Sequence, residues 1–340
     1  DKFVLSPAHV LFATEYNLLT KWVTDDKRKA VINNVQQLTA KSMREFRRHC
    51  DAMAVGAGDG VIGTVASVTT AAGVDTVVLD TTYGAKLVRY GQDVNVYSAA
   101  LTTNRTAAGE REITFHDLAN RTIKFASVAG IIAGDVIVAS GLTATPPVGI
   151  KGVTYHHSNA STGTWLGFDR STTPEIRATR VNGNSAALTL PLPRLALNLA
   201  GDRVGMDNVG HFEAWMHPAQ AGAYEELGFL VTQINSTGEG KGLDLYFGGA
   251  MQMAGAPVKK SFNWHRQRID FVNMEYWGRG ELQPIDFHKD GSGSIMINLR
   301  GASGGLAAAL IFYIVGSFDM FVSNPAGCSY IDSLAIPTGY

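Results

Sequence analysis

A long amphipathic helix is the strongest constraint on how this 340-residue chain can fold. Over residues 27–55, apolar residues recur at spacings of three, four and eight, which places them on one face of a 3.6-residue period. These residues are Val31, Val35, Leu38, Phe46, Cys50 and Met53. At about 1.5 Å per residue the helix would be roughly 40 Å long, which predicts an elongated subunit. Gly56 and Gly58 follow it, as glycine does after a last helical turn.

After the helix the pattern changes to short β-rich runs separated by Gly, Asn and Asp, and Pro146 and Pro147 close this segment. The predicted strands are Thr76–Leu79, Lys86–Tyr90, Asp93–Tyr97, Glu112–Phe115, Thr122–Ala126 and Asp135–Ala139. Closely spaced strands without helices indicate a small barrel or sandwich. We therefore expect a β-domain inserted into a larger body.

The rest of the chain mixes helices and strands, so the predicted fold class is α+β. Before the long helix, Phe3, Leu5, Val10 and Phe12 suggest extended structure, and Thr14–Val23 suits a short helix. Later helices are predicted at Leu192–Val204 and from Pro218 to about Leu230. Later strands are predicted at His211–Met216, Arg268–Phe271, Ser294–Leu299, Ala307–Val315 and Asp319–Val322.

Composition narrows the function classes. The 29 basic and 30 acidic residues give a net charge of -1, which lacks the electrostatic footprint of a sequence-reading nucleic-acid binder. Charged residues make up only 17%, below the usual quarter, which suggests a surface covered by copies of the same chain. The longest apolar run, Leu306–Val315, is too short to span a bilayer, so no membrane is expected. Cys50 and Cys328 are predicted to be two buried thiols in a reducing compartment.

No motif in the sequence predicts catalysis. The neighbours His156 and His157 would point to opposite faces of a strand and could not easily share a metal. The glycines of residues 56–60 end a helix, whereas a Rossmann loop opens one, and those of residues 238–242 lack the Walker spacing. Both segments are predicted to be turns. We expect a protein that is not an enzyme, with no catalytic residue, no cofactor and no metal site.

Two groups of side chains could form an interaction surface. One is a basic cluster on the far half of the long helix: Lys41, Arg44, Arg47 and Arg48. It could contact phosphates without reading sequence, or it could be a solvated face partly balanced by Glu45 and Asp51. The other group pairs tryptophan with arginine, at Trp264 with residues 265–268 and at Trp277 with Arg279. Such pairs suit a self-assembly interface, but core tryptophans beside surface arginines explain them as well.

Several motifs, taken in order, carry a resemblance to a known family. The helix is followed by Met53-Ala54-Val55-Gly56-Ala57-Gly58-Asp59-Gly60 and then by Gly63-Thr64-Val65-Ala66-Ser67-Val68. Further on come Gly91-Gln92-Asp93-Val94-Asn95-Val96, Gly134-Asp135-Val136-Ile137-Val138 and Ile150-Lys151-Gly152-Val153. The most specific run is Gly163-Thr164-Trp165-Leu166-Gly167-Phe168-Asp169-Arg170-Ser171-Thr172-Thr173-Pro174-Glu175. The sequence resembles the major capsid proteins of tailed bacteriophages with the Hong Kong 97 fold, in a branch with an inserted β-barrel.

The resemblance implies a division into five parts. Residues 1–26 would be a remnant of an N-terminal arm and extended loop, and residues 27–60 the spine helix of a peripheral domain. Residues 61–147 would be the inserted β-barrel, residues 148–300 the axial domain, and residues 301–340 the last strands of the peripheral domain. The chain would form hexamers and pentamers of an icosahedral shell around double-stranded DNA. It would be assembled in the bacterial host cytoplasm and end in the virion, with scaffold, portal and decoration proteins as further partners.

In this family the spine helix runs along the inside of the shell. The resemblance therefore gives the hypothesis that Lys41, Arg44, Arg47 or Arg48 face packaged DNA. Three other functions stay open: an encapsulin-like compartment with a protein cargo, a tail or baseplate protein, and a β-rich depolymerase. The inserted β-domain disfavours the first, the long helix before the insertion disfavours the second, and the missing catalytic motif disfavours the third.

Overall fold

The structure, a computed structural model, describes residues 8–17, 34–205, 211–234, 246–247, 250–289, 291, 293–295, 297–300 and 306–338. The chain divides into two compact units. Unit 1 comprises Asp1–Val4, Ala52–Gly278 and Met320–Tyr340, and unit 2 comprises Leu5–Asp51 and Arg279–Asp319. Both contain helix and strand, so the predicted α+β class is confirmed. Among the residues described, no helix is long and apolar enough to cross a membrane.

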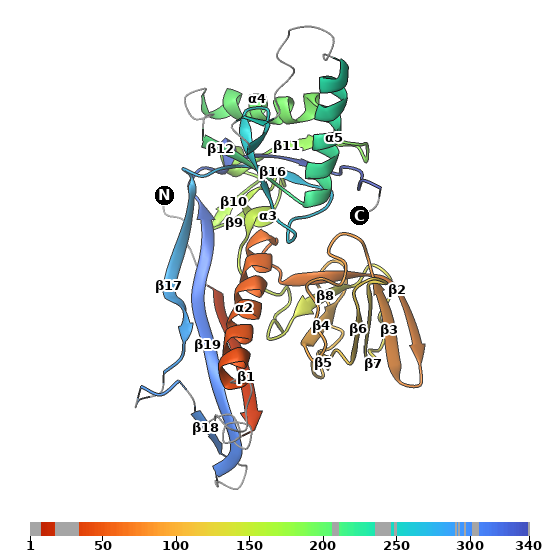
Figure 1. Cartoon of the computed structure of the whole chain (residues 1–340), viewed down its shortest axis with the longest axis vertical. Helices are drawn as coiled ribbons and strands as arrows, with labels where there is room; N and C mark the ends of the chain where they lie inside the picture. Colours follow the sequence, from red (N-terminus) through yellow and green to blue (C-terminus); the bar gives the residue numbers. More distant parts are fainter. Residues whose placement is uncertain are drawn as a thin grey trace. The chain divides into compact units, whose positions relative to one another are not determined.

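Unit 2 is built on an open antiparallel sheet with one long helix (Figure 1). The sheet has the order β1-β19-β17, and β18 also pairs with β19. Its strands are β1 (Ala8–Asn17), β17 (Trp277–Phe287), β18 (Ile297–Arg300) and β19 (Leu306–Val322). β1 and β19 pair along ten residues, from Ala8 opposite Phe318 to Asn17 opposite Ala309. The helix that Thr14–Val23 predicted is therefore wrong at residues 14–17, which are strand, and residues 18–23 lie outside the described part.

The long predicted helix is α2 (Asn34–Val55), and residues 27–33 of the prediction lie outside the described range. Its buried face in unit 2 carries Ser42, Phe46 and Cys50, each four residues from the next. The ring of Phe46 meets that of Phe12 on β1 edge to face at 6.4 Å, and the Ser42 hydroxyl bonds Thr14 at 3.1 Å. The apolar period of the sequence thus marks the face that packs on the sheet, as predicted.

The last predicted strands need a correction. Instead of separate strands at Ala307–Val315 and Asp319–Val322, β19 continues unbroken for 17 residues. Gly316 lies between the two predicted segments, and a side chain there would put its Cβ 2.9 Å from the Ile285 side chain of the neighbouring strand. The glycine therefore permits close packing between strands and does not make a turn.

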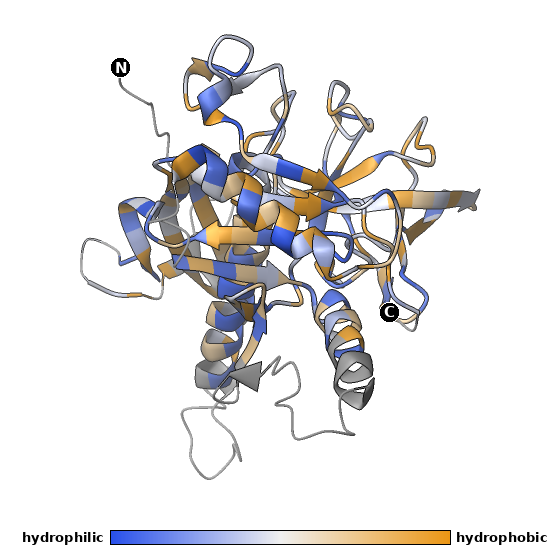
Figure 2. Cartoon of the chain, turned by 90° about the horizontal axis from the view of Figure 1, so that it is seen from above, coloured by the Kyte–Doolittle hydropathy of each residue, from blue (hydrophilic) through white to orange (hydrophobic). Residues whose placement is uncertain are grey.

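One seven-stranded sheet of unit 1 mixes parallel and antiparallel pairs in the order β11-β20-β16-β12-β15-β14-β13. Helices α4 (Pro191–Val204) and α5 (Pro218–Ile234) belong to the same unit. Along α4, hydrophobic and hydrophilic residues are interspersed (Figure 2). The core around this sheet includes Leu197, Phe212, Met216, Phe271 and Ile331. The strands are β11 (Thr179–Asn182), β12 (Phe212–Met216), β13 (Tyr246–Phe247), β14 (Ala250–Met253), β15 (Ala256–Lys260), β16 (Ile269–Asn273) and β20 (Ser329–Asp332).

The residues that follow α2 along the chain form a second seven-stranded sheet, of order β5-β4-β8-β2-β3-β7-β6. It is curled, because its end strands β5 and β6 are separated only by Ile113 and Thr114. The amide of Ile113 donates to Gln92 O, beside β4, and that of Thr114 donates to Lys124 O on β7. The strands are β2 (Val61–Ala71), β3 (Val74–Leu79), β4 (Asp93–Tyr97), β5 (Arg111–Glu112), β6 (Phe115–Asp117), β7 (Thr122–Ala126) and β8 (Val136–Ala139).

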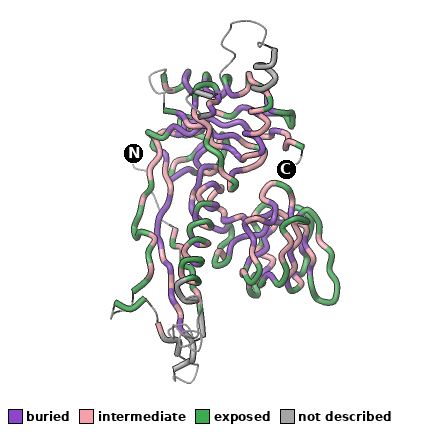
Figure 3. Tube along the Cα trace, in the orientation of Figure 1, coloured by how far each residue is buried: buried purple, intermediate pink, exposed green. Residues whose placement is uncertain are grey.

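One predicted strand in this segment is wrong. Residues 86–90 form turns, with the amide of Val88 donating to Ala85 O, although Leu87 and Val88 are buried. These apolar residues fill the interior without joining the sheet. In β3 and β7 buried positions alternate with less buried ones, the pattern of strands with one face inward, whereas β4 and β8 are buried almost throughout (Figure 3).

Short elements complete unit 1. They are α3 (Val153–His156), β9 (Thr164–Trp165), β10 (Phe168–Asp169), η1 (Pro174–Ile176) and η3 (Pro325–Gly327). His156 ends a helical turn and does not lie on a strand, which corrects the expectation for the His156-His157 pair. Residues 56–60 form the predicted turn, with Gly58 and Gly60 at positive φ, whereas residues 238–242 lie outside the described part. The five-part division of the chain stays a prediction.

Candidate functional site

The four basic residues singled out in the sequence all lie on α2, and all four are exposed. Lys41, Arg44, Arg47 and Arg48 follow one another at spacings of three and one, so helical geometry groups them on one side. The buried residues Ser42, Phe46 and Cys50 define the opposite side. We call the four residues the basic face.

The basic face has the chemistry of a surface for anions. Four flexible cations along about two turns of helix can reach several phosphates, but they offer no fixed array that would read a base sequence. The structure groups all four predicted residues on one exposed side of α2.

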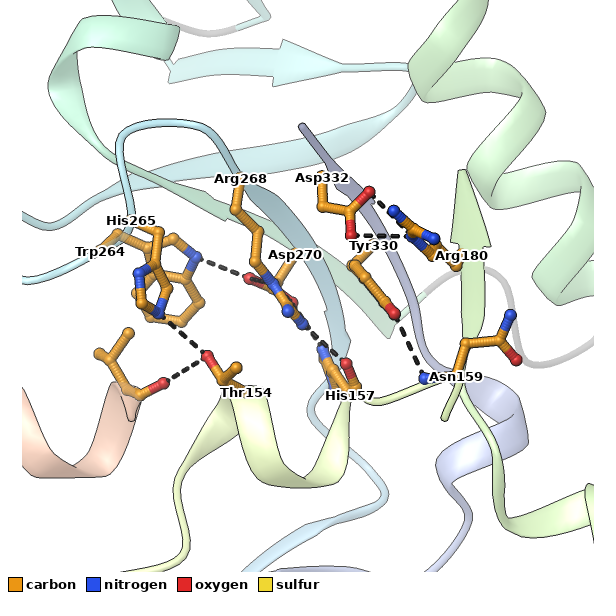
Figure 4. Close-up of polar contacts among 11 residues, drawn as sticks. Thr154, His157, Asn159, Arg180, Trp264, His265, Arg268, Asp270, Tyr330 and Asp332 are labelled. Atoms are coloured by element: carbon orange, nitrogen blue, oxygen red, sulfur yellow. Dashed lines mark hydrogen bonds and ion pairs between the residues drawn. The ribbon is translucent and has the colours of Figure 1, made fainter. Parts of the chain in front are cut away.

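A second set of polar residues lies inside unit 1, centred on Asp270 of β16 (Figure 4). The carboxylate of Asp270 is 1% exposed and accepts bonds from three side chains. His157 Nδ1 is 3.0 Å from Oδ1, and Trp264 Nε1 is 2.8 Å from Oδ2. Arg268 reaches both oxygens through Nε at 2.9 Å and Oδ1 through Nη2 at 2.7 Å. We call Asp270, His157, Arg268 and Trp264 the ion cluster.

Further bonds tie the ion cluster to neighbouring segments. Arg268 Nη2 also donates to the carbonyl of His157 at 2.8 Å, and its guanidinium lies 4.0 Å from the ring centroid of Tyr330 on β20. The Tyr330 hydroxyl accepts the amide of Asn159 at 3.2 Å. β16, β20 and the segment after α3 are thus joined through one buried carboxylate.

The charges of the ion cluster sustain one another. Burial would raise the pKa of Asp270, but Arg268 and the bond from His157 hold it well below its usual range. For His157, burial disfavours the proton, yet Cys328 and Asp270 outweigh it and raise the pKa to about 9. His157 is therefore a buried imidazolium at neutral pH, paired with a buried carboxylate.

The neighbouring histidines behave in the opposite way. Burial lowers the pKa of His156 to about 3, and it lowers those of His217 and His265 to about 4. His156 bonds the Met320 carbonyl at 2.9 Å and accepts Trp165 Nε1 at 3.0 Å. His265 bonds the Thr154 hydroxyl at 3.2 Å, and that hydroxyl donates to Val55 O at 2.8 Å.

This arrangement fits a structural role and not chemistry on a substrate. His157 and Asp270 are 0% and 1% exposed, so no substrate reaches them. In the part of the chain that is described, no three His, Cys, Asp or Glu residues are placed to hold a metal ion. Cys50 and Cys328 are free and buried, as expected.

The ion cluster was not predicted from the sequence. His157 and Asp270 are 113 residues apart, and nothing in one sequence indicates that they meet. The interface hypothesis for Trp264 and Arg268 is corrected, because Trp264 is buried, stacks on Trp215 at 5.4 Å and bonds Asp270. The core explanation, which was left open beside it, holds for Trp264. The polar character of residues 264–270 was the only available signal.

Solved structures with a similar chain include chains from phage and GTA particles. A chain of the cyanophage A-1(L) capsid asymmetric unit is 12% identical, with 96% of this chain and 77% of that chain covered and a TM-score of 0.49. A chain from Gordonia phage Cozz is 10% identical, with 97% and 70% covered and a TM-score of 0.43. A chain of the empty GTA particle capsid is 11% identical, with 98% and 74% covered and a TM-score of 0.42.

No protein-family model matches the sequence, and no curated protein matches it. With all three TM-scores below 0.5, the structural likenesses by themselves assign neither a function nor a partner.

Proposed function

We propose that the chain is a major capsid protein of the Hong Kong 97 type, which self-assembles into hexamers and pentamers of an icosahedral shell enclosing double-stranded DNA. The order of elements carries the proposal. A 22-residue helix is followed by a glycine turn, a curled β-sheet and a mixed sheet with helices, and a 17-residue strand then returns to the sheet of unit 2. This is the order that the sequence resemblance implies, including a β-barrel insertion.

The surface supports self-assembly. Among the described residues, five large apolar side chains are each more than 60% exposed: Leu11, Tyr90, Val148, Phe262 and Leu282. Only 17% of residues are charged, so the surface is poor in the groups that keep monomers apart. Copies of the chain that covered these side chains would remove apolar area from water, which favours association.

The basic face of α2 is proposed to point toward packaged DNA. Lys41, Arg44, Arg47 and Arg48 are exposed together, and their side chains suit phosphates of any sequence. A shell lining needs this kind of contact, because it must hold DNA without selecting it. The functional location is then the virion capsid, after assembly in the bacterial cytoplasm.

Electron microscopy of the assembled protein, together with absorbance at the nucleic-acid and protein maxima, tests the proposal. Closed icosahedral shells that contain DNA are the expected result. Shells filled with a protein cargo would replace the proposal with an encapsulin-like compartment, and tubes or discs would favour a tail or baseplate protein. Small discrete oligomers under conditions that permit assembly would overturn it.

A further inference from the structure

The edge strand β1 has an unpaired side. It ends the sheet order β1-β19-β17, and no strand among the described residues pairs with its far edge (Figure 1). A ten-residue edge strand presents a row of backbone N–H and C=O groups that can accept another strand. In a soluble protein such an edge is normally blocked or covered.

The side chains of β1 do little to block it. His9, Leu11, Ala13 and Glu15 are exposed on one face, and Leu11 is 63% exposed. The other face lies toward α2, where Thr14 bonds Ser42. Over residues 8–17 the strand has no proline and no lysine, and Glu15 is its only carboxylate.

The opposite edge of the same sheet is protected. β17 contains Pro284, which cannot donate a backbone hydrogen bond to an added strand. It also carries exposed Arg279, Glu281 and Asp286. Proline and charge are the usual devices against pairing between edges, so β17 is protected against an added strand, whereas β1 is not.

We propose that β1 pairs antiparallel with β1 of a second copy, with Phe12 facing Phe12 across a twofold axis. The pairing rests on the proposed function, since it would be one of the contacts between copies in the shell. Two identical strands that pair antiparallel always place one residue opposite itself. The choice of that residue fixes the register and every other pair.

Charge selects Phe12 as the central residue. With Phe12 on the axis, His9 faces Glu15 of the second copy, and Glu15 faces its His9, so the histidine and the only carboxylate of the strand become partners. With Leu11 on the axis His9 would face Ala13, and with Ala13 on the axis Glu15 would face Leu11. The Phe12 register also places Leu11 beside Ala13 and joins two aromatic rings.

The contact is small, so we expect it to be weak between free subunits. It joins two four-stranded sheets into one continuous sheet, but a single strand pair buries far less than the ~1,600 Å² of an ordinary stable interface. In a shell, where other contacts hold the copies close, the effective concentration is high enough to populate it. The test therefore captures the pair inside particles.

Disulfide trapping tests the register. Leu11 faces Ala13 of the second copy, and directly opposed residues have Cβ atoms about 4.5–5.5 Å apart, close to what a disulfide needs. The variant L11C/A13C, assembled and mildly oxidised, should give covalent dimers on a non-reducing gel. The control L11C/E15C also exposes two cysteines on the same face of β1. These two cysteines would lie opposite each other only if Ala13, and not Phe12, lay on the twofold axis. It should yield several-fold less dimer. The unsubstituted chain, whose Cys50 and Cys328 are buried, gives the background.

Equal trapping in both cysteine variants, or none in either, would overturn the proposal. Microscopy of the same samples separates it from the capsid function. Shells without the crosslink remove only the β1 pairing, whereas the crosslink in small oligomers keeps the pairing and removes the shell.

A charge exchange gives an independent measurement. In the L11C/A13C background, H9E places two carboxylates opposite each other and should lower the yield of dimer roughly two- to fivefold. Adding E15H restores an opposite pair and should restore the yield. No loss with H9E, or a loss that E15H leaves unchanged, would contradict the proposed register.

Discussion

The basic face of α2 and the ion cluster of unit 1 both gather arginine, but in opposite surroundings. Arg268 makes three bonds to a buried carboxylate, whereas Arg44 and Arg47 stand on an exposed helix face. A buried charged group whose hydrogen bonds are all made within the fold cannot bind another molecule. Removing it leaves the charge that it neutralised buried without a partner. An exposed cation costs the fold little and stays available. From this difference we expect the ion cluster to matter for stability and the basic face to matter for the proposed DNA contact.

Removing the carboxylate at the centre of the ion cluster should have the largest effect. Asp270→Asn leaves Arg268 and His157 as buried positive groups, and breaking a buried pair in this way costs about 3–5 kcal/mol. Urea unfolding of the variant subunit should show a loss of this size. A loss below about 1 kcal/mol would mean that the cluster is wetter and less important than its burial indicates.

Neutralising the basic face should leave stability unchanged and affect DNA. With Lys41, Arg44, Arg47 and Arg48 all changed to Gln, the unfolding free energy should move by less than about 0.5 kcal/mol per site. Four lost phosphate contacts remove a slope of roughly 3.6 in log affinity against log salt, or about a hundredfold between 50 and 200 mM.

The measurement is DNA binding or retention at several salt concentrations. Lys259→Gln with Lys260→Gln, on two exposed lysines of unit 1, removes charge elsewhere and serves as the control. An unchanged salt slope in the α2 variant would remove the DNA-facing hypothesis.

Acid should weaken unit 1 through its neutral buried histidines. The folded-state pKa values of His156, His217 and His265 lie near 3–4, below the unfolded value of 6.5. The unfolded chain therefore binds protons first as pH falls, and stability present above pH 6.5 is lost between pH 6.5 and about 4. Each histidine contributes about 1.4 kcal/mol per pH unit in this window.

His157 has the opposite sign. With its pKa near 9, its contribution is complete below pH 6.5 and is lost as pH rises through 9. Unfolding free energies at pH 7, 6 and 5 measure the acid slope, and His156→Gln should reduce it by one proton. A flat profile over this range would show that the three histidines are more hydrated than their surroundings indicate.

The exposed ion pair Arg180–Asp332 should have the smallest effect. Its side chains are 40% and 25% exposed, and the guanidinium Nε lies 2.8 Å from the carboxylate. Asp332→Asn should cost at most about 1 kcal/mol, since solvent screens the pair. Together with Asp270→Asn it compares the same two residue types at different depths. Equal losses of unfolding free energy in the two variants would mean that burial does not decide how much each ion pair contributes to stability.

The sequence predicted elements whose signal is local. Asp93–Tyr97 and Thr122–Ala126 match β4 and β7 to the residue, and the apolar period of residues 34–55 matches the buried side of α2. The four basic residues were grouped correctly because helical spacing alone decides that. Whether they meet DNA was not decided by spacing.

What the sequence could not predict depends on distant neighbours. Gly316 lies inside a strand because Ile285 packs against it, and residues 86–90 fill a core without joining its sheet. The charge of His157 depends on Asp270, which arrives from another strand. In each case the structure depends on a residue at least 30 positions away or on a surface formed by the folded chain. A periodic pattern in the sequence cannot indicate such a contact.

The chain enters and leaves the curled sheet at the same place. The amide of Ala139 donates to Gly60 O at 3.0 Å, and that of Gly149 donates to Gly58 O at 2.7 Å, so both junctions lie side by side. A segment whose two ends lie side by side can be removed, added or exchanged without distorting the rest of the fold. A foreign domain with adjacent ends could therefore be displayed in place of the curled sheet.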